Sequence, residues 1–128
     1  MKYYIAKNLP CTFEEAVKKT TEELQKEGFG VLSEINIHEK LKDKLGVKFN
    51  RYRILGACNP PSAYKALLSE IHIGVMLPCN VIVRELDDKT VEVSAVDPMA
   101  SMMAVENEEL GPIAEEIKDR LKRVIQAI

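Results

Sequence analysis

The C-terminal segment, residues 110–128, constrains the fold of this chain more than any other part of the sequence. Its apolar residues recur at steps of three and four: Leu110, Ile113, Ala114, Ile117, Leu121, Val124, Ile125 and Ile128. This spacing predicts an amphipathic helix with one continuous apolar face. The helix is therefore a core element, and the rest of the chain has to be organised around it.

The remaining sequence alternates strand and helix signals. Thr12 and Glu15 form a capping box that begins a helix, which Gly28 ends, and Asn59 before two prolines begins another. Residues 38–46 predict a charged amphipathic turn or two that closes at a glycine. Strands are predicted at Lys2–Ala6, Val31–Ile37, Arg51–Cys58, Val75–Leu86 and Thr90–Val96, the last two joined by a hairpin turn at 87–89.

These elements follow the order βαββαββα and predict an α+β fold. We expect a largely antiparallel sheet of about five strands, with helices packed on one face and a long C-terminal helix. The length of 128 residues fits a single domain, residues 1–128, which can bury one core without disulfide or metal staples.

Charge and composition narrow the classes of function. The chain has 18 Lys and Arg against 20 Asp and Glu, a net charge of −2, and few aromatic residues. A nucleic-acid binder usually carries a basic excess, so we expect no nucleic-acid partner. We also expect no membrane association and a cytoplasmic location, because no apolar stretch suits a signal peptide or a membrane span. Three cysteines without a C-x-x-C pair are then expected to remain thiols.

Cys58 is the first candidate for chemistry. It ends a predicted strand immediately before a helix N-terminus, where the partial positive charge favours a thiolate. A nucleophilic, redox-sensing or soft-metal role is one interpretation. The alternative is a small buried structural cysteine, since no His and acid partner can be recognised in the sequence.

Cys79 is the second candidate, because Pro78 beside it interrupts the strand ladder and marks an edge, a bulge or an opening. Two cysteines with Met99, Met102, Met103 or His72 would suit a soft ion such as Cu(I). No ligand spacing marks such a site, so the sequence assigns no metal, and methionines also fill irregular gaps in cores. It identifies no cofactor.

Three short segments share one property: each interrupts or ends a strand with a turn-forming residue, which frees backbone and side chains for a ligand. We therefore predict one ligand-binding region at the cysteine-bearing strand ends. Its candidate residues are Cys58, Asn59, Pro60, Pro78, Cys79, Asn80, Asp97, Pro98 and Met99. The alternative is that the three are unrelated turns and a bulge.

Three runs, YRILGACNPP, ALLSEIHIGVMLPCNVIVRE and VDPM, resemble the family numbered 302 among the domains of unknown function. The resemblance covers nearly the whole chain from Tyr3 onward. It implies a small α+β domain similar to the TATA-binding-protein-like fold class, commonly a homodimer, and supplies no mechanism. The matching positions are Cys58, Asn59, Pro60, Pro78, Cys79, Asp97, Pro98 and Met99; the departure is His72-Ile73, where relatives often have an acidic residue and proline.

The function predicted from these observations is a non-enzymatic, homodimeric domain that binds a small molecule or a partner at the cysteine-bearing strand ends. The homodimer is also expected because Met76 and Ile82 lie opposite the main apolar face of their strand, on a sheet face that one helical layer leaves uncovered. The alternatives are a thiol-dependent enzyme or redox protein using Cys58, and a soft-metal or haem-associated binding protein.

Overall fold

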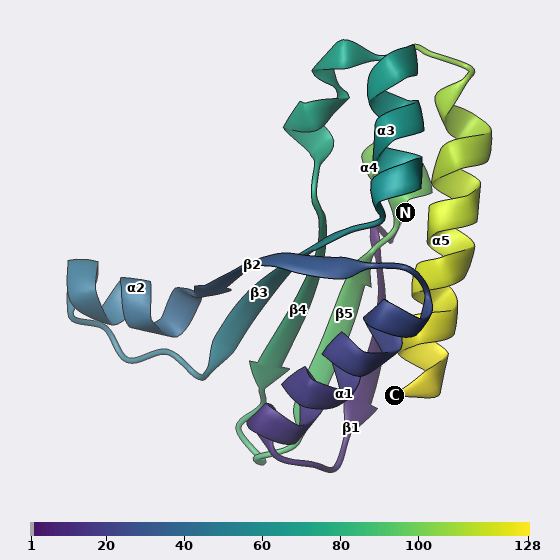
Figure 1. Ribbon diagram of the computed structural model, residues 1–128. Coiled ribbons are helices and arrows are strands. Elements are labelled where there is room, and N and C mark those ends of the chain that lie inside the picture. Colours follow the sequence, from purple (N-terminus) through teal and green to yellow (C-terminus); the bar gives the residue numbers. More distant parts are fainter. Residues whose placement is uncertain (1) are drawn as a thin grey trace.

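The computed structural model describes residues 2–128 and confirms the α+β architecture (Figure 1). Five strands form one sheet in the order β1-β5-β4-β3-β2, and every neighbouring pair is antiparallel. The strands are β1 (Tyr4–Leu9), β2 (Gly30–Asn36), β3 (Tyr52–Cys58), β4 (Cys79–Glu85) and β5 (Val91–Val96). The helices are α1 (Phe13–Lys26), α2 (Ile37–Leu45), α3 (Pro60–Ser69), the 3₁₀ helix η1 (Ile71–Met76), α4 (Pro98–Ser101) and α5 (Leu110–Ala127).

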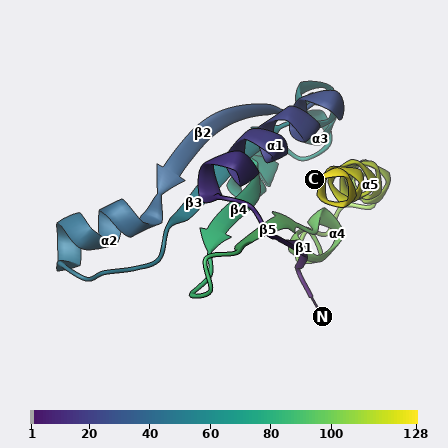
Figure 2. The ribbon, with the colours of Figure 1, turned by 90° about the horizontal axis from the view of Figure 1, so that it is seen from below.

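Helices α1 and α5 pack on one face of the sheet (Figure 2). Alternate residues of β4 and β5 point into this layer, and Val81, Val83, Val91, Val93 and Ala95 are fully buried. The apolar face of α5 packs against them as its periodicity predicts. Its buried residues are Leu110, Ala114, Ile117, Leu121, Val124 and Ile125.

The opposite face of the sheet carries the other set of alternating residues. Tyr52, Ile54 and Ile82 are half-buried there, and Tyr4 is exposed. Glu92 lies on the same face and accepts hydrogen bonds from Arg84 Nε at 2.9 Å and Ser94 Oγ at 3.2 Å. Neither α1 nor α5 covers this surface, which we call the open face of the sheet.

The predicted caps of α1 are confirmed. Thr12 Oγ1 accepts a hydrogen bond from the Glu15 N–H at 3.2 Å, and the Thr12 hydroxyl donates to the Glu15 carboxylate at 2.9 Å. Gly28 follows the helix at φ = +84°, a left-handed conformation that favours glycine.

Several element boundaries differ from the prediction, and Ile37, predicted as the last residue of a strand, begins α2. Strand β1 continues to Leu9, because Lys7, Asn8 and Leu9 pair with β5. Strand β4 begins at Cys79, whereas residues 75–78 were predicted as its first part. Met76 belongs to η1, so of the two residues predicted on the open face only Ile82 lies on the strand. The segment that connects β5 to α5, residues 97–109, contains α4, whose four residues are too few to show the periodicity of a helix.

Candidate functional site

Three strand ends meet at one end of the sheet. The register pairs Ala57 with Cys79, which places the end of β3 beside the start of β4, and β5 ends next to β4 shortly before Pro98. Helix α3 leaves this end of the sheet and packs against α5 (Figure 1). The strand ends and the two helices border a partly open cavity of about 310 Å³, which we call the strand-end cavity.

The strand-end cavity contains five of the candidate residues. Cys58, Asn59, Pro78, Cys79 and Pro98 line it, so each of the three predicted segments contributes to one cavity. The two thiols come to it from neighbouring strands. Cys79 is paired with Ala57 and shares its face of the sheet, and Cys58 follows Ala57 and leaves from the other face.

The other four candidates lie outside the cavity. Pro60 is exposed in the first turn of α3, and Asn80 is exposed on the open face. Asp97 caps α4 by accepting a hydrogen bond from the Met99 N–H at 3.0 Å, and its carboxylate pairs with Lys118 Nζ at 3.0 Å. Met99 lies in a shallow hollow between α4 and the start of α5.

The cavity lies at the junction of two hydrophobic clusters. The large cluster lies between the sheet and α1 and α5, and reaches the cavity through Ala57 and Ile117. A small cluster around Ala66, Ile73 and Leu110 joins α3, η1 and the start of α5. Since the cavity lies where the two clusters meet, both contribute apolar side chains to its wall.

Several wall residues were not predicted as site residues. They are Leu32, Ser62, Ala63, Ala66, Leu67, Leu77, Met102, Ile113, Ala114 and Ile117. Three of them, Ile113, Ala114 and Ile117, belong to the apolar face predicted for residues 110–128, so periodicity could not separate a cavity wall from a filled core. Leu32 has a different origin: the register of β2 and β3 shifts between Val31 and Ser33, and this bulge leaves Leu32 without a partner at the rim.

The N-terminus of α3 offers no free backbone donor to the cavity. Pro60 and Pro61 have no N–H, and the Ser62 N–H donates to Asn59 Oδ1 at 3.2 Å. The Ala63 N–H donates to the Asn59 carbonyl at 2.9 Å. The amides that usually hold an anion at a helix N-terminus are therefore absent or already used.

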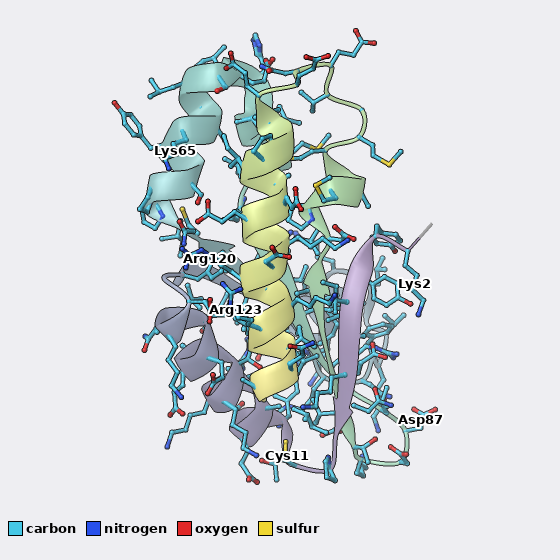
Figure 3. All side chains as sticks on the ribbon, turned by 90° about the vertical axis from the view of Figure 1, so that its right-hand side faces the viewer. Lys2, Cys11, Lys65, Asp87, Arg120 and Arg123 are labelled. Carbon is cyan, nitrogen blue, oxygen red and sulfur yellow. The ribbon has the colours of Figure 1, made fainter. Side chains whose placement is uncertain are left out.

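Asn59 is held in place from the other side as well. Its Nδ2 donates to the Glu27 carbonyl at 3.4 Å, and Arg120 Nη1 donates to the same oxygen at 3.1 Å. Arg123 pairs with the Glu27 carboxylate at 2.9 Å, and Figure 3 shows both arginines on α5. This network ties the end of α1 to α5 and to the cap of α3, so it fixes one wall of the cavity.

The two cavity cysteines differ in their surroundings. Burial, and secondly the neighbouring Cys58 thiol, raises the pKa of Cys79 to about 11. All three cysteines of the chain are free thiols and half-buried. Cys79 is consequently a neutral thiol at physiological pH.

We expect iodoacetamide to label Cys58 faster than Cys79 in the folded protein at neutral pH. The thiolate is the reactive form, and a pKa of about 11 keeps the thiolate of Cys79 scarce. Labelling of Cys79 should accelerate as the pH rises towards that value. Timed labelling with peptide mapping measures both rates, with Cys11 as an internal reference; faster labelling of Cys79 than of Cys58 would contradict this expectation.

The histidines lie away from the two thiols. His38 Nδ1 accepts a hydrogen bond from the Tyr52 N–H at 2.9 Å, beyond the far end of β3, and His72 is exposed on η1. Within residues 2–128, no group of three or more His, Cys, Asp or Glu side chains is placed to hold a metal ion. Across the same residues, no helix is both long enough and apolar enough to cross a membrane.

The fold and the cavity together define the class: an α+β domain whose antiparallel sheet ends in an apolar cavity bordered by two thiols. Residues 5–128 match the family described as "Domain of unknown function DUF302", and the chain belongs to that family. It is also similar to the crystal structure of the uncharacterized conserved protein DUF302 from Bacillus stearothermophilus. That similarity has 27% sequence identity and a TM-score of 0.91, and it covers 99% of this chain and 98% of the other. None of the curated proteins compared with the chain matches it.

Proposed function

We propose that the protein is a binding domain for a small, neutral, apolar molecule held in the strand-end cavity. The observation that carries the proposal is the cavity itself, whose volume of about 310 Å³ falls at the lower end of the range for small-molecule sites. The wall of this cavity is almost entirely apolar and partly open to solvent, and an apolar ligand would cover it and give its side chains contact partners.

The composition of the wall supports a neutral ligand. Among residues 2–128, no Asp, Glu, Lys, Arg or His lines the cavity. Its amide side chain, Asn59, is used in capping α3 and in the bond to Glu27. A charged ligand would lose hydration and meet no side chain of opposite charge, only the Ser62 hydroxyl and the two thiols as weak polar partners, which carries a large free-energy cost.

The same geometry favours binding over catalysis at Cys58. An acyl-transfer enzyme needs a base beside the thiol and donors for the developing oxyanion. Neither His38 nor His72 lines the cavity, and the α3 amides that could act as donors are used. We therefore assign Cys58 and Cys79 to the wall of the binding site.

The experiment uses two dyes that share one aromatic core. N-phenyl-1-naphthylamine is neutral and fluoresces in apolar surroundings, and 8-anilinonaphthalene-1-sulfonate adds a sulfonate. We expect saturable binding of the neutral dye to the reduced protein and at least about tenfold weaker binding of the sulfonate, since about 1.4 kcal/mol of uncompensated desolvation is enough for that ratio.

Two variants locate the dye. Ala63→Leu adds bulk inside the cavity and should weaken binding of the neutral dye by about tenfold or more, through the cost of overpacking. Lys65→Leu places the same side chain on the exposed side of α3 and should leave binding unchanged (Figure 3). The proposal is wrong if the neutral dye does not bind the wild-type protein, or if Ala63→Leu binds it as well as wild type.

We propose a homodimer formed through the open face of the sheet. Tyr4, Tyr52, Ile54 and Ile82 give this face apolar area, and its charged pair of Arg84 and Glu92 is internally neutralised at 2.9 Å. Two copies of such a face can pack together without like-charge repulsion. Light scattering should return twice the chain mass of 14.4 kDa.

The three free thiols suit a reducing compartment, so the proposal includes the cytoplasm.

A further inference from the structure

Residues 37–51 form an arm that projects from the sheet, and we call this segment the arm. Its helix, α2, stands away from the α1–α5 layer and meets the rest of the fold mainly at β3 (Figures 1 and 2). None of the nine residues of α2 is buried. The helix therefore adds no buried residue to the core, and the arm meets the core at its root, where His38 and Arg51 lie beside the Phe13 ring.

A helix of this length needs a packing partner. Isolated helices shorter than about 12–15 residues are marginal in water, and most helical stability in proteins comes from a buried apolar face. In α2, Ile37, Leu41 and Leu45 recur at steps of four and form an apolar face on one side of the helix, which is not buried within one copy. Leu45 is 69% exposed, and Val47 and Phe49 extend the exposed apolar surface beyond the helix.

The root of the arm is fixed, although its outer part is uncovered. Tyr52 N–H donates to His38 Nδ1 at 2.9 Å, and Arg53 Nε donates to Asn36 Oδ1 at 2.7 Å. On the return path, Asn50 Nδ2 donates to the Asp87 carboxylate at 2.7 Å. An arm held in one orientation loses little conformational entropy when it binds.

Charge is divided between the arm and the body of the protein, residues 2–36 and 52–128. The arm contains five basic and two acidic side chains, a net charge of +3: Lys40, Lys42, Lys44, Lys48 and Arg51 against Glu39 and Asp43. The other 13 basic and 18 acidic side chains leave the rest of the chain at −5. Within one copy, Arg51 Nη2 pairs with Glu14 Oε1 of the body at 2.6 Å, whereas the four lysines of the arm form no salt bridge within residues 2–128.

We propose that the arm docks on the body of a second copy of the chain, each copy contributing one arm. Packing one arm against the other arm would bring two +3 segments together, whereas packing an arm on a body pairs +3 with −5. Phe49 lies 6.1 Å from Tyr52 between ring centroids, so the apolar surface of the arm continues onto the open face. This inference rests on the proposed homodimer and names the element that completes its interface.

The test measures molar mass by light scattering across a dilution series, with matched pairs of variants. Lys42→Glu with Lys44→Glu reverses the arm charge and should raise the dimer dissociation constant about tenfold or more. Lys18→Glu with Lys19→Glu makes the same charge change on the exposed side of α1 and should not weaken the dimer. Leu45→Ser should also weaken it, and Leu68→Ser should not, although both leucines are 69% exposed.

Salt gives a second measurement on the wild-type protein. Raising the ionic strength from about 0.1 M to about 1 M shortens the Debye length from about 10 Å to about 3 Å. The dimer should dissociate more readily at the higher value. Circular dichroism on each variant confirms that the domain remains folded, and binding of the neutral dye should be the same in all of them.

Each result bears on a different proposal. A monomeric wild type overturns both the homodimer and the docked arm, and leaves the cavity proposal to the dye experiment. A dimer that the arm variants do not weaken overturns the docked arm alone. A monomer whose arm instead binds vesicles of phosphatidylglycerol and phosphatidylcholine assigns the arm to an anionic lipid surface and overturns the proposal.

Discussion

Replacing Phe13 by alanine is expected to lower the free energy of unfolding by about 3–5 kcal/mol, the usual cost of removing a buried phenyl ring. Phe13 is 1% exposed at the start of α1, in the large hydrophobic cluster. The Arg51 guanidinium carbon lies 4.2 Å from its ring centroid and that of Arg53 lies 5.2 Å away. The substitution therefore removes core packing and also the support of the arm root.

Urea denaturation measures this loss, and Phe49→Ala is the matched control. Phe49 is 50% exposed on the arm, so its substitution should change the unfolding free energy by about 0.5 kcal/mol or less at concentrations where the protein is monomeric. A loss below about 1 kcal/mol for Phe13→Ala would mean that the α1–sheet layer packs less tightly than its burial indicates.

The elements that the sequence predicts best carry signals within a few residues of each other. The capping box of Thr12 and Glu15, the left-handed Gly28 and the long periodicity of α5 are local patterns, and all three are present in the fold. The alternation in β4 and β5 likewise predicts which residues are buried. Each of these features depends on residues that are close together in the sequence, so it can be predicted without knowledge of contacts between distant segments.

The segment at 71–77 shows where local pattern is insufficient. Val75, Met76 and Leu77 continue the apolar pattern of β4, so they predict the start of a strand, yet Val75 and Met76 end η1 and Val75 is exposed. The decisive contact is distant in sequence: Ile73 is buried in the small cluster with Ala66 and Leu110. A single sequence does not show whether such a distant contact will make this short segment a strand or a 3₁₀ helix.

The candidate site was predictable as a location and not as a cavity. Turn-forming residues mark Cys58-Asn59, Pro78-Cys79 and Pro98 at strand ends, and an antiparallel sheet brings those ends together. The wall also depends on the spacing of α3 from α5 and on the bulge that positions Leu32. Those distances follow from packing between segments far apart in the chain, so no local pattern specifies them.

Gly56 links the cavity to the packing of the sheet, because two neighbours occupy the space that a side chain would need. A Cβ atom built on Gly56 would meet Ser33 Oγ and would lie 2.9 Å from Pro78 Cγ. The Ser33 side chain can rotate away, but Pro78 is a rigid ring beside Cys79. An added methyl group must therefore displace Pro78 and with it one wall of the strand-end cavity.

We expect Gly56→Ala to cost about 1–3 kcal/mol of unfolding free energy, as overpacking does in other cores, and to weaken binding of the neutral dye. Gly30→Ala on the adjacent strand is the control, since nothing lies within 4 Å of its added Cβ and its φ is not positive. It should be neutral or stabilise the fold by about 0.4–1 kcal/mol, because alanine restricts the unfolded chain more than glycine does.

Adding Ser33→Gly to Gly56→Ala separates the contact with Ser33 from the contact with Pro78. If Pro78 is the obstacle, this second change restores little stability and no dye binding; full recovery would show that Ser33 was the obstacle and that Pro78 does not fix the cavity wall.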